Sequence, residues 1–94
     1  MRTRAIKVIP LANYHIQVWY EDGRCVIYNV KQDIDHIKAF KALEDKEQFQ
    51  KVYLQYNGYS IAWGDGDEFS DPTIDCEVPY DEGAVLINGE TYYG

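Results

Sequence analysis

The sequence has few of the residues that would cross-link a small chain or place it in a membrane. Its 94 residues include two cysteines, Cys25 and Cys76, which are too few for a disulfide scaffold or a cysteine-rich zinc site. No apolar run approaches the roughly 20 residues that a membrane-spanning helix needs. No apolar segment follows the basic residues 1–4, as a signal peptide would require. We therefore expect one cytoplasmic domain over residues 1–94, with no membrane association and two ordinary thiols.

Basic residues are missing from the second half of the chain. All nine Lys and Arg lie within residues 1–51, where seven acids leave a net charge of +2. Residues 52–94 hold nine acids and no Lys or Arg, a net charge of −9. Phosphate contacts depend on Lys and Arg, so we expect no direct binding of nucleic acid here. The asymmetry favours a basic protein partner or a bound cation, and a solvated acidic face that keeps the domain soluble is the alternative.

Candidate catalytic groups are also scarce. The histidines are His15 and His36, and no Ser or Cys stands at a strand-to-helix elbow where a nucleophile would be activated. We expect no enzymatic activity and no cofactor.

The segment of residues 14–30 reads as a β-hairpin. Asp22-Gly23 separates two β-prone runs, residues 14–20 and 25–30. This is a strong hairpin signal, because both central residues of a type I′ turn need positive φ.

The expected register of this hairpin follows from a two-residue loop. It would pair Tyr20 with Cys25 and Val18 with Ile27, and it would bury Val18 and Ile27 on one face. The opposite face would then carry an apolar and aromatic patch, which is Trp19, Val26 and Tyr28. We expect this patch to be covered by residues 84–93 or to form a homodimer contact.

Helical spacing replaces the strand pattern after the hairpin. Apolar residues recur from Ile34 to Leu43, which predicts a helix over about residues 32–41 that loosens near Phe40. Asp45-x-x-Gln48 resembles a capping box and predicts a short second helix with Phe49 turned inward.

A second hairpin is predicted around Asn57-Gly58, between strands at residues 52–56 and 59–63. Residues 70–83 are acidic and contain Pro72, Pro79 and Gly83, which predicts mostly loop. Residues 84–93 form either a third small hairpin or a flexible tail.

The predicted fold class is α+β. We expect an antiparallel sheet of four to five strands with one or two helices packed on one face. The predicted order is β-β-β-α-α-β-β, followed by an irregular acidic C-terminal segment.

The residues we expect to bind a partner combine aromatic anchors with acids. Trp and Tyr are common interface anchors, and the acids cluster in the glycine-containing loop after Trp63. The candidates are Trp19, Tyr28, Trp63, Asp65, Asp67, Glu68 and Asp71. Alternatively, the loop from Asp65 to Asp71 serves a small calcium-type protein or an enzyme, although it lacks the glycine and glutamate spacing of an EF-hand. We assign no metal ligands.

The order and spacing of four segments resemble a small bacterial family called domain of unknown function 2442. The segments are residues 6–11, 16–23, 40–49 and 61–67, so the similarity covers about residues 5–70. The resemblance implies a compact α+β domain, sometimes joined to a helix-turn-helix, with no established catalytic residues. Some members of the family are encoded beside another small uncharacterised protein, so the resemblance also implies an arrangement that suggests a toxin and its antitoxin.

The chain departs from this family after Asp71-Pro72. Members usually end soon after the tryptophan and glycine segment, whereas residues 71–94 form an acidic, tyrosine-containing extension. No helix-turn-helix pattern is present in that extension. We therefore expect a non-enzymatic interaction module, antitoxin-like in role, that docks a basic protein through its acidic half.

Overall fold

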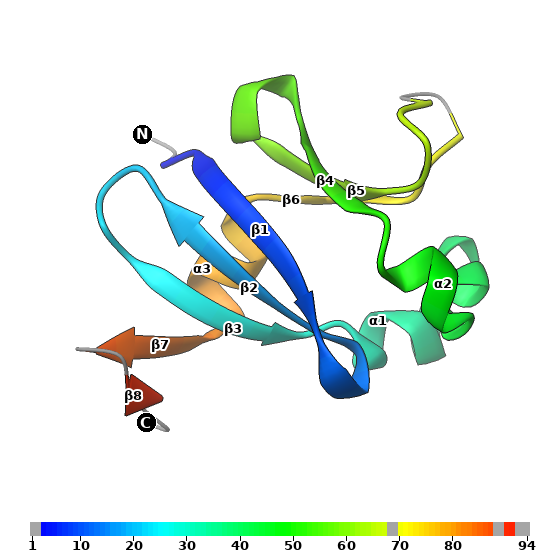
Figure 1. Ribbon diagram of the computed structural model, residues 1–94, viewed down its shortest axis with the longest axis horizontal. Coiled ribbons are helices and arrows are strands. Elements are labelled where there is room, and N and C mark those ends of the chain that lie inside the picture. Colours follow the sequence, from blue (N-terminus) through cyan, green and yellow to red (C-terminus); the bar gives the residue numbers. More distant parts are fainter. Residues whose placement is uncertain (1–2, 68–69, 88–89, 92–94) are drawn as a thin grey trace.

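The computed structural model describes residues 3–67, 70–87 and 90–91, and it has the predicted α+β class (Figure 1). The strands are β1 (Ala5–Leu11), β2 (His15–Tyr20), β3 (Cys25–Asn29), β4 (Val52–Gln55), β5 (Ser60–Trp63), β6 (Thr73–Asp75), β7 (Ala84–Ile87) and β8 (Glu90–Thr91). The α-helices are α1 (Lys31–His36), α2 (Lys46–Phe49) and α3 (Glu77–Glu82), and the 3₁₀ helices are η1 (Ala12–Tyr14), η2 (Lys38–Glu44) and η3 (Tyr56–Gly58). No helix of these described residues is long and apolar enough to cross a membrane.

The strands form two antiparallel sheets. The larger sheet has the order β1-β2-β3-β7, with β8 beside β7, and the smaller sheet has the order β4-β5-β6. Figure 1 shows the larger sheet at the left with α3 behind it, and the smaller sheet at the upper right. The predicted sheet of four to five strands is confirmed. The second hairpin does not join it, because β5 pairs with β6 instead.

The first hairpin has a different register from the predicted one. The Tyr20 carbonyl accepts a hydrogen bond from the Gly23 amide at 3.0 Å, and the Tyr20 amide donates to the Arg24 carbonyl at 2.8 Å. The loop therefore has three residues, with Gly23 at φ 93°, which is the type I turn with a glycine bulge found in such hairpins. Trp19 pairs with Cys25, so the predicted pairing of Tyr20 with Cys25 is wrong by one residue.

The shift of one residue moves alternate side chains of β3 to the other face of the sheet. Val26 is 0% exposed and Tyr28 is 2% exposed, so both lie in the core. Trp19 lies on the opposite face, half-buried with Cys25 and Ile27. The expected face of Trp19, Val26 and Tyr28 therefore does not exist. The prediction that a homodimer contact forms through this face is wrong, because Val26 and Tyr28 are not at the surface.

The helical region breaks earlier than predicted. Helix α1 ends at His36, and the extended backbone of Ile37 (φ −113°, ψ 115°) separates it from η2. The N-cap role of Asp45 is confirmed, because its side chain accepts from the Glu47 amide at 2.9 Å, whereas the predicted capping box would use the Gln48 amide. Phe49 then turns inward and is 2% exposed, as predicted.

The second hairpin turns at Asn57-Gly58, as predicted. Asn57 has φ 58° and ψ 28°, Gly58 has φ 93°, and the Tyr59 amide donates to the Tyr56 carbonyl at 3.2 Å. These values match a type I′ turn. The turn is pressed against the start of β1, since a Cβ atom on Gly58 would lie 1.9 Å from the Ala5 carbonyl oxygen.

The C-terminal extension is ordered where it is described, which corrects the expectation of an irregular segment. Beyond Pro72 it supplies β6, α3 and β7. Pro79 is the third residue of α3, within the first turn, where a missing amide hydrogen is tolerated. Strands β7 and β8 pair as the predicted third hairpin, while its Asn88-Gly89 turn lies outside the described residues. Strand β7 extends the sheet beside β3 and does not cover its face.

Tyrosine side chains attach α3 to the first hairpin. The Tyr20 hydroxyl donates to the Cys76 carbonyl at 2.6 Å, and the Tyr80 hydroxyl donates to Asp22 at 2.7 Å. The Arg24 guanidinium lies 4.1 Å from the centre of the Tyr80 ring. The extension is therefore held by residues on both sides of the hairpin turn.

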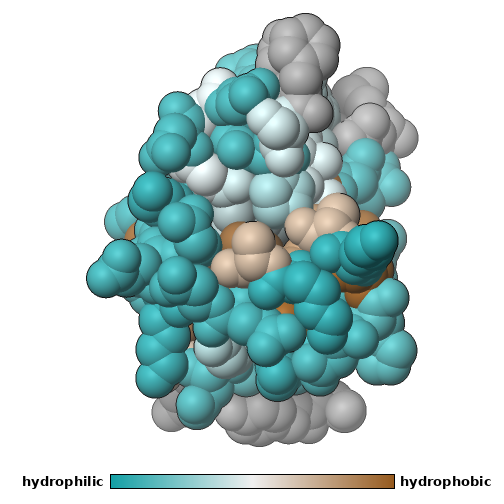
Figure 2. Space-filling model, turned by 90° about the vertical axis from the view of Figure 1, so that its right-hand side faces the viewer, coloured by the Kyte–Doolittle hydropathy of each residue, from teal (hydrophilic) through white to brown (hydrophobic). Residues whose placement is uncertain are grey.

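The core lies between the larger sheet, the smaller sheet and the helices. Trp63 of β5 is 1% exposed, with ring centres 5.8 Å from Phe40 and 6.2 Å from Phe49. Burying such aromatic side chains contributes several kcal/mol each, at about 25 cal/mol per Å² of apolar surface. The end of the molecule that carries α2 is mostly hydrophilic, with a short apolar strip at its centre (Figure 2).

Candidate functional site

A groove of about 470 Å³ opens between α1, β6 and α3. We call it the acid-rimmed groove. It is lined by Tyr28, Gln32, Asp33, His36, Ile37, Ile74, Asp75, Val78 and Glu82. These residues come from both halves of the sequence and are brought together by the pairing of β6 with β5 and by the attachment of α3 to the first hairpin.

The inner end of the acid-rimmed groove is the Tyr28 hydroxyl. It donates to Asp33 Oδ2 at 2.6 Å and accepts from Gln32 Nε2 at 3.2 Å. Burial, followed by the bond to the Asp33 carboxylate, raises the pKa of Tyr28 above its ordinary value. The phenol therefore stays neutral and fixes the orientation of the Asp33 carboxylate.

The rim of the groove is negatively charged. Three carboxylates line it, from Asp33, Asp75 and Glu82, and no Lys or Arg is among the lining residues. Asp33 is half-buried, whereas Asp75 and Glu82 are exposed. Asp75 also accepts a hydrogen bond from the Glu77 amide at 2.9 Å, which fixes its side chain at the start of α3.

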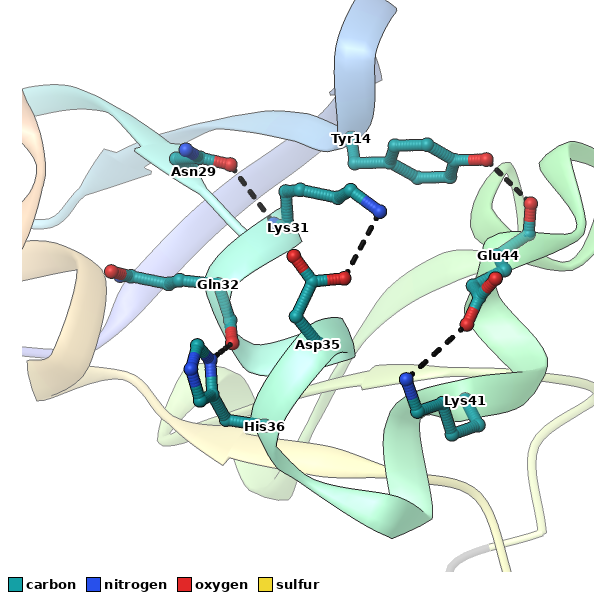
Figure 3. A network of polar contacts seen from close by, with 8 residues as sticks. All are labelled: Tyr14, Asn29, Lys31, Gln32, Asp35, His36, Lys41 and Glu44. Atoms are coloured by element: carbon teal, nitrogen blue, oxygen red, sulfur yellow. Dashed lines mark hydrogen bonds and ion pairs between the residues drawn. The ribbon is translucent and has the colours of Figure 1, made fainter.

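His36 lines the groove and is bound to its own helix. Its Nδ1 lies 2.7 Å from the Gln32 carbonyl oxygen (Figure 3). A carbonyl oxygen only accepts, so Nδ1 carries the proton and Nε2 is the remaining ring nitrogen.

Apolar side chains complete the groove. Ile37 is 43% exposed, because the break between α1 and η2 turns it outward. Ile74 is 9% exposed and Val78 is half-buried. The groove is thus amphipathic, with aliphatic side chains beside carboxylates.

Two nearby lysines are paired with acids on the other side of α1. Lys31 Nζ lies 3.0 Å from Asp35, and Lys41 Nζ lies 3.5 Å from Glu44. Figure 3 shows both pairs on the side of α1 that faces Tyr14, while His36 and Gln32 lie on the other side. The positive charges of Lys31 and Lys41 are therefore turned away from the acid-rimmed groove.

A second cavity, of about 330 Å³, lies at the turn between β1 and β2. Its lining includes Tyr14 and Phe49, whose rings meet edge to face at 5.3 Å, and Lys46 as its charged residue. Without a carboxylate among its lining residues, this cavity does not suit a basic partner.

The predicted acidic loop uses its carboxylates internally. Asp71 Oδ2 accepts from the Tyr53 hydroxyl at 2.7 Å and from the Gly66 and Asp67 amides at 3.0 Å each. The Asp67 carboxylate accepts from the Ser70 hydroxyl. This loop is a closed hydrogen-bonded turn, with Asp71 as its central acceptor.

Among the described residues, the remaining acid of the loop belongs to a surface ion pair. Asp65 is exposed and pairs with Lys51 at 3.2 Å, and Glu68 lies outside the described residues. No group of three or more His, Cys, Asp or Glu suited to a metal occurs in the part of the chain that the structure describes. No observation favours the calcium or enzyme alternative.

The predicted aromatic anchors lie in three different environments. Trp63 is 1% exposed, so it cannot reach a partner, and its assignment as an anchor is corrected. Trp19 is half-buried on the outer face of the larger sheet, with Lys7 Nζ 4.8 Å from its ring centre. Only Tyr28 belongs to the acid-rimmed groove, where it is 2% exposed and acts through its hydroxyl.

The sequence reasoning missed most of the groove. In the sequence, Asp75 and Glu82 are only members of an acidic segment, and Asp33 is only a residue near the start of a predicted helix. The acids at residues 75–82 were a usable signal, because they fall together without an intervening base. Nothing in the sequence brought them next to Asp33.

Comparison with known proteins settles the family. A family model described as a protein of unknown function, DUF2442, matches residues 5–74, most of the chain. The chain belongs to the DUF2442 family. The matched segment ends within β6, so the DUF2442 domain contributes α1 and Ile74 to the groove, and α3 follows the match. No curated protein and no solved structure shows significant similarity to the chain.

Proposed function

We propose that this DUF2442 chain is a non-enzymatic interaction module that docks a basic protein partner through its acidic half. The observation that carries the proposal is the separation of charge: residues 52–94 hold nine acids and no Lys or Arg. Two of these acids, Asp75 and Glu82, line the acid-rimmed groove. A field of one sign steers an oppositely charged partner and raises its association rate.

The antitoxin-like role is the narrower part of the proposal. It rests on the arrangement implied by the family, in which some members are encoded beside another small protein. In that role the basic partner would be the toxic protein, and docking would block it. The cytoplasm is the compartment we propose, where free thiols such as Cys25 and Cys76 persist.

The docking proposal is tested by capture from native-host lysate. The tagged full chain is incubated with lysate at about 50 mM and about 500 mM salt, and bound proteins are quantified by mass spectrometry. Screening lengths fall from roughly 14 to 4 Å between these salt levels. We expect one basic protein to be enriched at low salt and largely lost at high salt. If nothing is enriched at either salt, or if the captured protein is acidic, the proposal is refuted.

The antitoxin-like role is tested with the captured protein. Its expression alone should slow growth, and co-expression of the chain should restore growth. A captured protein that is harmless when expressed alone would refute this role and leave the docking function in place.

A further inference from the structure

The acid-rimmed groove has the chemistry of a receptor for basic side chains. Its lining places aliphatic groups from Ile37, Ile74 and Val78 beside the carboxylates of Asp33 and Glu82. Lys and Arg have this same division, with an apolar stem that lies along aliphatic surface and a charged head that seeks carboxylates. An apolar ligand would leave the carboxylates desolvated and unpaired, and a small cation would leave the apolar side chains without contacts.

We propose that the acid-rimmed groove is where the partner docks, and that it receives a basic segment whose Arg or Lys side chain lies in the groove. The stem of that side chain contacts Ile37 and Val78, and its head contacts Asp33 or Glu82. The inference rests on the proposed function, because the groove can act in this way only if the chain docks a basic partner.

Charge complementarity favours this occupant over a second copy of the chain. The chain has a net charge of −7, so two copies repel one another. Two cations near the groove, Lys31 and Lys41, are held by Asp35 and Glu44 on the other side of α1. The net negative charge of the chain therefore favours a basic group from another protein.

The orientation of Asp33 favours Arg over Lys. The Tyr28 hydroxyl orients the Asp33 carboxylate, with Oδ2 accepting from Tyr28 at 2.6 Å. A fixed carboxylate suits the planar guanidinium, which donates from a rigid fork, better than the point charge of an ammonium.

The test uses peptide probes and the full chain. The probes are peptides of alternating Ala and Arg, about ten residues long, with counterparts in which Lys or Gln replaces Arg. Affinity is measured by fluorescence anisotropy, and the site is located from amide chemical shifts. We expect the Arg peptide to bind more tightly than the Lys peptide, with the Gln peptide not bound, and the largest shifts to fall on α1, β6 and α3.

Two pairs of variants of equal charge locate the site. Asp33→Asn with Glu82→Gln removes two of the three carboxylates of the rim, and Glu44→Gln with Glu47→Gln removes the same charge elsewhere on the exposed surface. The rim pair should weaken binding of the Arg peptide about tenfold, and the control pair by less than about twofold. Ile37→Ala should also weaken binding, which a response to charge alone would not predict.

The failures of the groove and of the proposed function are distinguishable. Equal weakening by both pairs, or shifts centred on another surface, would overturn the groove and leave the docking function standing. If no basic peptide binds and the lysate yields no basic partner, both are refuted. Should the rim pair fail to fold, Glu82→Gln alone replaces it, because that residue is exposed on α3.

Discussion

Two glycines with the same φ angle allow the energy of the contact between the second hairpin and β1 to be estimated. Gly23 and Gly58 both have φ 93°. A Cβ atom added at Gly23 would meet nothing within 4 Å, whereas one at Gly58 would lie 1.9 Å from the Ala5 carbonyl oxygen. Alanine at either position loses about 1–2 kcal/mol of stability from its left-handed backbone. Only Gly58→Ala adds a collision.

The collision cannot be relieved at low energy. Ala5 is 0% exposed and pairs with Tyr20, so β1 has no room to retreat. The turn must move instead, which breaks the hydrogen bond from Arg4 to the Asn57 carbonyl, 3.2 Å long. Overpacking costs about 1–3 kcal/mol and the lost hydrogen bond about 1 kcal/mol. Gly58→Ala should therefore cost about 3–6 kcal/mol in total, against about 1–2 kcal/mol for Gly23→Ala.

Urea unfolding followed by circular dichroism measures both losses on the same scale. For a domain of this size, each kcal/mol lowers Tm by about 4–8 °C, so Gly58→Ala should melt well below Gly23→Ala. If the two variants lose equal stability, the close approach of Gly58 to Ala5 is refuted, because their backbone contributions are matched.

Three further predictions follow from side-chain hydrogen bonds. The bond from the Tyr80 hydroxyl is the largest cause that lowers the pKa of Asp22, so Tyr80→Phe should raise that pKa toward its usual value in an NMR titration, and an unchanged pKa would contradict the contact. Burial raises the pKa of Tyr28, so above about pH 10 the folded state keeps this proton while the unfolded state loses it. The free energy of unfolding should therefore stay level up to about pH 10 and fall above it. A rise in the free energy of unfolding above that pH would contradict the assignment. Asp71→Ala removes the acceptor of three hydrogen bonds and should cost about 2–3 kcal/mol of stability by urea unfolding. Asp65→Ala removes only an exposed surface ion pair and should cost less than about 1 kcal/mol. Equal losses of stability would refute the central role of Asp71.

Features decided by adjacent residues were predictable from the sequence. The Asp45 cap and the Asn57-Gly58 turn each depend on a few consecutive residues, and both are confirmed. In each case one local conformation is strongly preferred, by the carboxylate acceptor at the helix start or by the positive φ of Asn and Gly.

The register of the first hairpin was not predictable in the same way. Glu21-Asp22-Gly23 serves a two-residue type I′ turn and a three-residue turn with a glycine bulge equally well. The choice between them decides whether Val26 and Tyr28 lie inside or outside. Both residues are buried in the hydrophobic core. This choice is made by tertiary packing, which the local sequence pattern does not contain.

The acid-rimmed groove depends on contacts between distant residues. Asp33 meets the C-terminal acids only because β6 joins β5 and because α3 is attached to the first hairpin. Sequence reasoning identified the charge of the C-terminal half but placed it in the loop at Asp65, since a sequence gives the quantity of charge and not its position in space.

The pairing of β3 with β7 has a consequence for folding during synthesis. Val26 pairs with Val85, so this pairing cannot form until Val85 has been synthesised. A ribosome that adds about 5–20 residues per second takes several seconds to make the chain between them. During that interval β1, β2 and β3 can already form a meander whose outer edge at β3 has unpaired backbone groups. Such an edge is a template for pairing with other nascent chains, so the chain is most prone to aggregate before its last strands emerge.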